Sequence, residues 1–233
     1  MKHYQNYIFD LYGTLIDIET DENRLLFWKK FADRFQLGDN YSALRKQYLS
    51  LCEKAQKKNP LVHAEIDLAP IFRELFQTDD DQKIAYMAYE FRKMSRKKYR
   101  LFPGVTETLE TIRKRGGHCY LLSNAQALFT RPELEESGLD QYLDGICISS
   151  EFGLKKPDIL FMEHLLAKYD LDRSASIMIG NDFTGDMECA QRCLMNSLFI
   201  NSGGYPEDTL MKMKKIYDIT AVADSVYEGL KDE

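Results

Sequence analysis

Residues 8–15 of this 233-residue chain read Ile8-Phe9-Asp10-Leu11-Tyr12-Gly13-Thr14-Leu15. The apolar residues before Asp10 predict a short buried strand that ends at this aspartate. In open parallel sheets, ligands bind at the carboxyl ends of the strands. A carboxylate at such an end, followed by a glycine that lets the backbone turn tightly, is placed to meet a substrate. An isolated aspartate before a glycine is more often a helix cap or a turn residue, so its meaning depends on the rest of the chain.

Short apolar runs recur along the chain, with helix-like segments between them. This alternation predicts a mostly parallel sheet with helices on both faces, which is a doubly wound α/β fold. The other expected strands contain residues 119–122, 146–148, 177–179 and 198–200, and the expected helices lie near residues 104–116, 157–169, 185–194 and 206–215.

The segment from residue 17 to residue 99 breaks this alternation. It shows helical periodicity in four amphipathic stretches and no convincing strand. Turn-forming residues at 38–40, 59–60 and 79–81 separate these stretches. We therefore expect a helical module, residues 17–99, inserted into an α/β core made of residues 1–16 and 100–233.

Composition excludes several classes of function. The chain has 31 Lys and Arg against 37 Asp and Glu, a net charge of −6, which argues against sequence-independent binding of nucleic acid. It has no uninterrupted apolar run of roughly 18 residues and no signal-like amino terminus, so we expect no membrane segment and a cytoplasmic location. Five cysteines without C-x-x-C spacing favour a reducing compartment over a disulfide framework.

Polar residues follow three more of the expected strands. Ser123 and Asn124 close the second, Lys156 precedes a proline that is favoured as a first helical residue, and an acidic cluster follows the fourth. Each feature alone is commonplace in a turn or on a solvated surface. The cluster contains Asn181, Asp182 and Asp186, and carboxylate and amide oxygens of this kind suit Mg²⁺.

The order of these motifs, Asp10, then Ser123, then Lys156-Pro157, then the acidic cluster, resembles the haloacid dehalogenase superfamily over essentially the whole chain. The resemblance extends to a helical cap inserted after the first strand. It implies that Asp10 is a nucleophile that forms an aspartyl-phosphate, and that Lys156 holds Asp10 and offsets developing charge.

The same resemblance implies the remaining site and the function. Substrate-binding candidates are Thr14, Ser123, Asn124 and Lys156, and Mg²⁺ would be held by Asp10, the backbone carbonyl of Tyr12 and the cluster of Asn181, Asp182 and Asp186. The expected function is a Mg²⁺-dependent phosphatase acting on a small phosphorylated metabolite. The oligomeric state stays open.

Two positions depart from the pattern of the family's phosphatases. Tyr12 stands where these enzymes usually have a second aspartate as general acid and base, and a tyrosine with an ordinary pKa near 10 is a poor proton shuttle at neutral pH. Phosphatase activity is therefore expected to be weak or limited to good leaving groups. Asn181 stands where many relatives have an aspartate, so either Asp182 replaces it as a ligand or Asn181 coordinates through its amide oxygen.

Two alternatives follow from these departures. Tyrosine at position 12 also occurs in the haloacid dehalogenase branch, where Asp10 would attack carbon and expel halide without metal. The other alternative is a non-catalytic relative that binds a ligand or partner.

Overall fold

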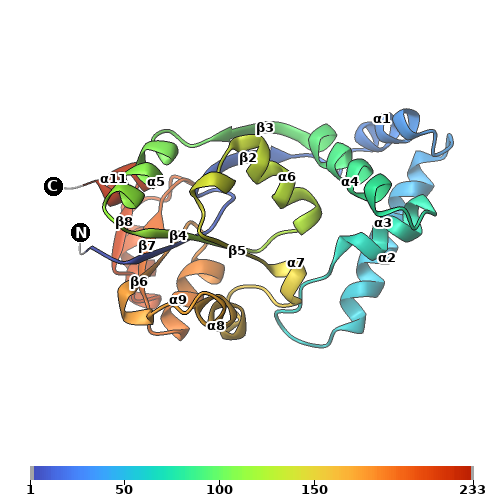
Figure 1. Cartoon of the computed structure of the whole chain (residues 1–233). Helices are drawn as coiled ribbons and strands as arrows, with labels where there is room; N and C mark the ends of the chain where they lie inside the picture. Colours follow the sequence, from blue (N-terminus) through green and yellow to red (C-terminus); the bar gives the residue numbers. More distant parts are fainter. Residues whose placement is uncertain (1–2, 232–233) are drawn as a thin grey trace.

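The computed structural model describes residues 3–231 and consists of an α/β core and a helical module beside it (Figure 1). The core contains a six-stranded sheet in which every neighbouring pair is parallel. In sheet order the strands are β5 (Gly145–Ile148), β4 (His118–Ser123), β1 (Asn6–Phe9), β6 (Ser176–Gly180), β7 (Asn196–Ile200) and β8 (Ala221–Ala223). The five expected strands are confirmed, and β8 was not predicted.

Helices cover both faces of this sheet because its central strand is apolar on both sides. Tyr7 and Phe9 of β1 pack toward α5 and α6, whereas Ile8 packs toward α8 and α9. One face is covered by α5 (Val105–Lys114), α6 (Ala127–Ser137) and α11 (Val226–Leu230), and the other by α8 (Ile159–Lys168), α9 (Glu188–Arg192) and α10 (Glu207–Ile216). The predicted doubly wound α/β fold is confirmed.

The start of α8 differs from the prediction. Its first residue is Ile159, and the side chain of Asp158 accepts a hydrogen bond from the backbone N–H of Leu160, which makes Asp158 the N-cap. Pro157 therefore lies before the helix, and its predicted place as the first helical residue is wrong.

The helical module contains the four expected helices. They are α1 (Leu25–Phe35), α2 (Tyr41–Lys58), α3 (Leu68–Phe76) and α4 (Asp81–Ser95). Their apolar faces enclose an aromatic cluster that includes Trp28, Phe31, Phe72 and Phe91. Phe129 of α6 joins this cluster from the core, and Leu128 packs beside it, so the core and the helical module share an apolar interface.

Two strands connect the module to the core, and the prediction of an all-helical segment between residues 17 and 99 is wrong at both of its ends. Strand β2 (Ile16–Thr20) pairs with β3 (Arg96–Leu101) in an antiparallel ribbon. Opposite charges face each other along it, Asp17 across from Arg100 and Glu19 across from Lys98, and such cross-strand pairs stabilise a sheet. The ribbon runs from the core to α4 (Figure 1). Charge pairing in place of an apolar run concealed these strands in the sequence.

Of the helices within residues 3–231, none combines the length and the apolar character that crossing a bilayer requires.

Candidate active site

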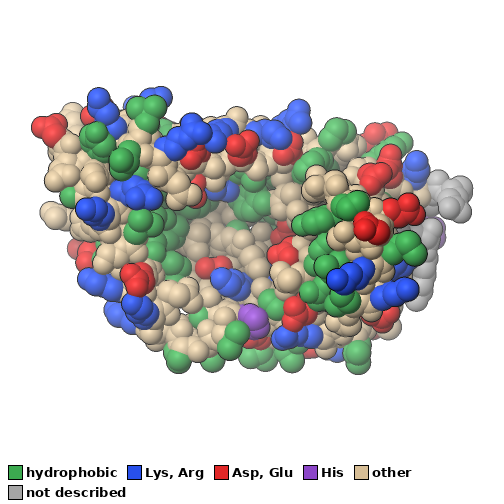
Figure 2. All heavy atoms as spheres, turned by 180° about the vertical axis from the view of Figure 1, so that it is seen from behind, with side chains coloured by type: hydrophobic (Ala, Val, Ile, Leu, Met, Phe, Trp, Pro, Cys, Tyr) green, Lys and Arg blue, Asp and Glu red, His purple; other side chains and the backbone are tan. Residues whose placement is uncertain are grey.

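The polar strand ends meet at one edge of the core sheet. Asp10 follows β1, Asn124 follows β4 and Asn181 follows β6. They line a cavity of about 490 Å³ that also contacts Lys156 and Asp186. The molecule is hollowed between the core and the helical module (Figure 2). The carboxyl ends of neighbouring parallel strands thus gather residues that are far apart in the sequence.

The side chain of Lys156 lies at the centre of this site and is almost fully buried, with 3% of the residue exposed. Its Nζ lies 2.8 Å from Asp10 Oδ1 and 2.6 Å from Asp186 Oδ1, and it donates to the carbonyl oxygen of Leu122 at 2.6 Å. An ammonium has three protons to donate, so three acceptors satisfy it. Burial lowers the pKa of Lys156, but Asp10 and Asp186 together raise it above its ordinary value, so this lysine stays charged.

Asp186 is occupied on both carboxylate oxygens. Oδ1 bonds Lys156, and Oδ2 accepts from the backbone N–H groups of Asn181 and Asp182, each at 3.0 Å. Burial raises the pKa of this carboxyl, and Lys156 opposes the shift. A Cβ on Gly180 would lie 2.1 Å from Asp186 Oδ2, so only glycine allows this approach. Asp186 thus orients Lys156 and the loop after β6.

Asn124 is also occupied. Its Nδ2 donates to the carbonyl oxygen of Lys156 at 3.0 Å, and its Oδ1 accepts from the Lys156 N–H at 2.8 Å. The side-chain amide therefore holds the backbone of the lysine from both sides. The structure places Asn124, expected to bind substrate, as a residue that positions Lys156.

Ser123 presents a hydroxyl that lacks a partner. Its side chain is fully buried at the end of β4, and its Oγ makes no hydrogen bond within residues 3–231. A buried polar group without a partner is costly, and an oxygen of a bound ligand would satisfy it. Both chain neighbours of Ser123, Leu122 and Asn124, bond Lys156, which makes this orphan hydroxyl a candidate donor to a bound anion.

The loop after β1 packs closely against Asn181. Thr14 is fully buried, and its Oγ1 donates to Asn181 Oδ1 at 3.3 Å. Gly13 has a φ of +85°, and a Cβ there would lie 2.1 Å from Asn181 Nδ2. The close approach and the positive φ both require glycine. In contrast, Asp182 is exposed, and its Oδ1 accepts from the N–H and the hydroxyl of Thr184, both at 2.9 Å.

The oxygen donors around Asp10 fit a hard divalent cation. Asp10, the backbone carbonyl of Tyr12 and the amide oxygen of Asn181 would hold it, with waters completing the shell, as Mg²⁺ prefers. No three His, Cys, Asp or Glu side chains within residues 3–231 form a metal-binding group, so such a site depends on the neutral oxygens. Three acidic side chains line this pocket, Asp10, Asp182 and Asp186, against the single ammonium of Lys156. An anionic substrate therefore requires a further positive charge there.

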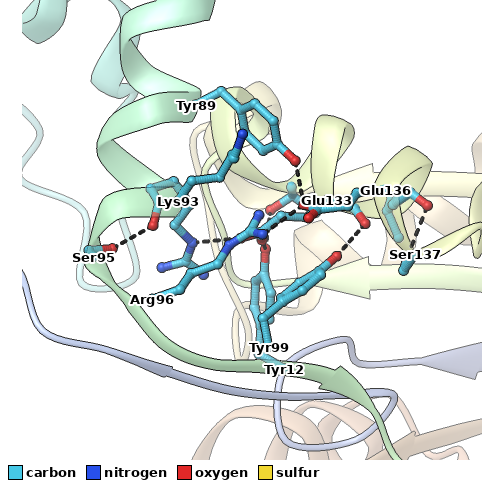
Figure 3. Close-up of polar contacts among 12 residues, drawn as sticks. Tyr12, Tyr89, Lys93, Ser95, Arg96, Tyr99, Glu133, Glu136 and Ser137 are labelled. Carbon is cyan, nitrogen blue, oxygen red and sulfur yellow. Dashed lines mark hydrogen bonds and ion pairs between the residues drawn. The ribbon is translucent and has the colours of Figure 1, made fainter.

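The hydroxyl of Tyr12 is bonded to side chains of α6. The Oη donates to Glu133 Oε2 and lies 3.0 Å from Thr130 Oγ1, both on α6 (Figure 3). The guanidinium of Arg92, from α4, lies 5.2 Å from the centre of the Tyr12 ring. Burial and the charge of Glu133 raise the pKa of Tyr12 far above its ordinary value. The proton of this hydroxyl is therefore not available for transfer at neutral pH.

No pattern in the sequence indicates Glu133 or Arg92 as site residues. Both lie within helices, far from any strand end, and α6 itself was not predicted. Glu133 is an acidic residue at a position that is completely buried on α6. This burial can be recognised only after the helix has been placed in the fold.

Comparison with known proteins agrees with this arrangement. The model of the haloacid dehalogenase-like hydrolase family matches residues 7–200. Glyceraldehyde 3-phosphate phosphatase of Methanothermobacter thermautotrophicus is 27% identical over 125 residues, which is 54% of this chain and 55% of that protein. Pyrimidine 5'-nucleotidase PynA of Streptococcus pneumoniae is 24% identical over 204 residues, 85% of this chain and 84% of that protein. The chain therefore spans about half the length of the first relative and most of the second.

Among solved structures, a dehalogenase with an intermediate complex superposes with a TM-score of 0.63 at 18% identity, over 100% of both chains. A likeness at this identity shows the fold alone. The family match, in contrast, extends from the strand before Asp10 to the strand after the acidic cluster. The chain therefore belongs to the family of haloacid dehalogenase-like hydrolases.

Proposed function

We propose that this hydrolase is a Mg²⁺-dependent phosphatase that acts on a small phosphorylated metabolite through an aspartyl-phosphate on Asp10. The observation that carries the proposal is a carboxylate held by a buried ammonium, with the orphan hydroxyl of Ser123 close by in the fold, at the end of the adjacent strand β4. This set offers a nucleophile, a positive charge and a hydrogen-bond donor to one phosphoryl group. The names of two relatives, both phosphate-ester hydrolases, support the same chemistry.

The residues divide the reaction into two displacements. The Asp10 oxygen that is not bonded to Lys156 attacks phosphorus, the bond between phosphorus and the leaving oxygen breaks, and the leaving oxygen takes its electron pair. Water then attacks the acyl phosphate and releases inorganic phosphate. Lys156 offsets charge on the reacting oxygens, and Ser123 donates to a phosphoryl oxygen. When bound, Mg²⁺ supplies charge neutralisation between the nucleophile and the phosphate.

The tethered hydroxyl of Tyr12 predicts a strong preference for good leaving groups. Since its proton is held by Glu133, an alkyl leaving group would depart without help from this side chain, and a positioned acid is worth roughly 10²–10⁴ in rate. We expect kcat/KM for acetyl phosphate and para-nitrophenyl phosphate to exceed that for glycerol phosphate at least about 100-fold. Steady-state assays of free phosphate, with and without Mg²⁺, measure this ratio, and equal values for all three substrates would contradict it.

Two separate substitutions test whether Asn181 or Asp182 is the metal ligand after β6. Asn181 lies against the loop that carries Asp10, whereas Asp182 caps the turn that follows. Asn181→Asp adds a negative charge beside the proposed cation and is expected to lower the Mg²⁺ concentration for half-maximal activity about tenfold, a change of about 1.4 kcal/mol. Asp182→Asn is expected to leave that concentration within about twofold. The reverse pattern in a Mg²⁺ titration after EDTA treatment would make Asp182 the ligand.

A second candidate function is C–halogen hydrolysis, which the tethering of Tyr12 favours. There Asp10 attacks carbon, halide leaves with its electron pair and needs no proton, and water hydrolyses the resulting ester. Halide release from 2-haloacids without metal would support this candidate, whereas Mg²⁺-dependent phosphate release would support the first. If neither product formed, the non-catalytic binding protein would be favoured.

A further inference from the structure

A largely buried group of four charged or polar residues joins the core to the helical module. This Glu133 cluster consists of Tyr12, Arg92, Arg96 and Glu133 (Figure 3). Glu133 is fully buried on α6. Its Oε1 accepts from Arg92 Nε at 2.9 Å and from Arg96 Nε at 3.0 Å, and its Oε2 accepts from the Tyr12 hydroxyl. One carboxylate therefore bonds three segments of the chain.

The charges of the cluster stabilise one another. A buried carboxylate is tolerated only when it is paired and hydrogen-bonded, and two guanidinium groups provide this pairing. Burial lowers the pKa of Arg92 and the charge of Glu133 raises it, with a net upward shift, so the arginine stays charged. The second guanidinium, Arg96, is shared with Glu136, whose Oε2 lies 2.7 Å from Arg96 Nη1. Removing either partner of such a pair leaves the other charge buried and unpaired.

If the helical module opened, α4 would have to move relative to the loop that carries Tyr12, and the cluster joins these two segments. Arg92 lies in α4 and Arg96 begins β3, at the base of the helical module. Tyr12 lies two residues after the proposed nucleophile, in a loop that hydrogen bonds hold tightly: Gly13 N–H to Ile16 O at 2.8 Å and Leu15 N–H to Leu11 O at 2.8 Å. These bonds make residues 11–16 one compact turn directly after Asp10, so a displacement of Tyr12 would move that turn.

We propose that Glu133 is a positioning residue that makes the conformation of the Asp10 loop depend on the docking of α4. When α4 is docked, its arginines fix Glu133, and Glu133 fixes Tyr12 and with it the loop that would present Asp10 to substrate. Position 12 thus serves as a latch between the two parts of the molecule instead of a proton shuttle. The kinetic consequence of this proposal rests on the proposed function, but the coupling between the two segments does not.

Hydrogen exchange of the free protein tests the coupling without substrate. Tyr12→Phe removes one hydroxyl from the loop and keeps the ring. We expect amide exchange to accelerate about tenfold in residues 11–16 and also in α4. Helix α4 lies some 80 positions away in sequence, but the hydrogen bond from Tyr12 to the charged carboxylate of Glu133 connects the two segments. Glu133→Gln should accelerate both segments at least as much. Faster exchange confined to residues 11–16 in both variants would overturn the proposal.

Two matched controls separate the latch from general destabilisation. Tyr99→Phe removes a hydroxyl that donates to the backbone carbonyl of Glu133 at 2.6 Å and not to its carboxylate. Glu136→Gln removes a carboxylate that also pairs with Arg96 but does not contact Tyr12. Neither is expected to change exchange in residues 11–16. If either control accelerated that loop as much as Tyr12→Phe, the effect would not depend on the Glu133 carboxylate, and the proposal would fail.

The split between kcat and KM provides the second readout. A displaced nucleophile slows the chemical step and leaves binding of the phosphoryl group intact. With acetyl phosphate we expect Glu133→Gln to lower kcat about tenfold with KM within about twofold, and Glu136→Gln to change neither. An unchanged kcat in Glu133→Gln would contradict the positioning role. If the wild-type protein released no phosphate from any ester, the proposed function would fail, and the exchange experiment alone would decide on the latch.

Discussion

Asp10→Asn is expected to lower phosphate release from acetyl phosphate by about 10⁴–10⁶-fold, the range found when a covalent nucleophile is removed from an enzyme. The amide keeps the size of the carboxylate and one acceptor for Lys156, so the variant should fold. What it loses is the anionic oxygen that attacks phosphorus. Asp172→Asn is a suitable control, because Asp172 is an exposed cap whose Oδ1 accepts from the Ser174 N–H at 2.8 Å.

A direct measurement can accompany the rates. Borohydride reduction during turnover, followed by mass spectrometry, should mark the peptide that contains residue 10 in the wild-type protein and leave it unmarked in Asp10→Asn. Activity within about tenfold of wild type in Asp10→Asn would rule out the aspartyl-phosphate route.

Lys156→Met is expected to damage both stability and activity. It removes the ammonium and leaves the carboxylates of Asp10 and Asp186 buried without their shared cation, a loss that typically costs about 3–5 kcal/mol in the free energy of unfolding. The adjacent Lys155→Met is the control, since Lys155 is only half-buried and its backbone N–H, not its side chain, bonds His63 O at 3.0 Å. Chemical denaturation followed by circular dichroism measures the difference.

The stability deficit of Lys156→Met should depend on pH in a defined direction. Burial raises the pKa of Asp186, and Lys156 is the group that opposes this shift. Without Lys156, the folded protein would hold a proton that the unfolded chain releases above its ordinary Asp pKa of about 4. Stability of the variant is therefore highest at low pH and is lost as the pH rises through the raised folded pKa. A deficit that grew toward low pH would contradict this account.

The activity of Lys156→Met should fall by at least about 10³-fold, because the charge at the phosphoryl oxygens and the orientation of Asp10 are lost together. If activity survived while stability fell, the lysine would serve only the fold.

The sequence placed Asp10, Lys156 and Asp186 at one edge of the sheet, and the structure brings these three side chains into contact. Asp10 directly follows β1, Asp186 lies in the helical turn after β6, and Lys156 lies in the loop between α7 (Ser149–Phe152) and α8. A parallel sheet brings the segments that follow its strands to a single edge. The direction of a side chain at that edge is a different matter. Asn124 and Asp182 lie at the correct edge, but the side chain of Asn124 bonds the backbone of Lys156 and that of Asp182 bonds the backbone of Thr184. Only packing decides this.

The Glu133 cluster could not be predicted from the sequence. Its members come from a loop, two helices and a ribbon, and no spacing in the sequence relates them. Their proximity follows from the docking of α4 on α6, which is a tertiary contact without a local signal. The ribbon was missed for a related reason. Strand β3 is rich in lysine and arginine, which pair with acids on β2, and its apolar residues Tyr99 and Leu101 alternate with these charges and do not form an apolar run.

Strands β2 and β3 also determine how the helical module is connected to the core. Because β2 leaves the core and β3 returns beside it, the helical module is topologically the loop of one long β-hairpin. Thr20 and Arg96 are paired across its mouth, so the exit and re-entry points are neighbours. The entropy of closing a loop grows only slowly with its length, and such a hairpin therefore accepts loops of very different size. Asp10, Lys156 and Asp186 all lie outside this hairpin, so a helical module of another size could be inserted there without moving them.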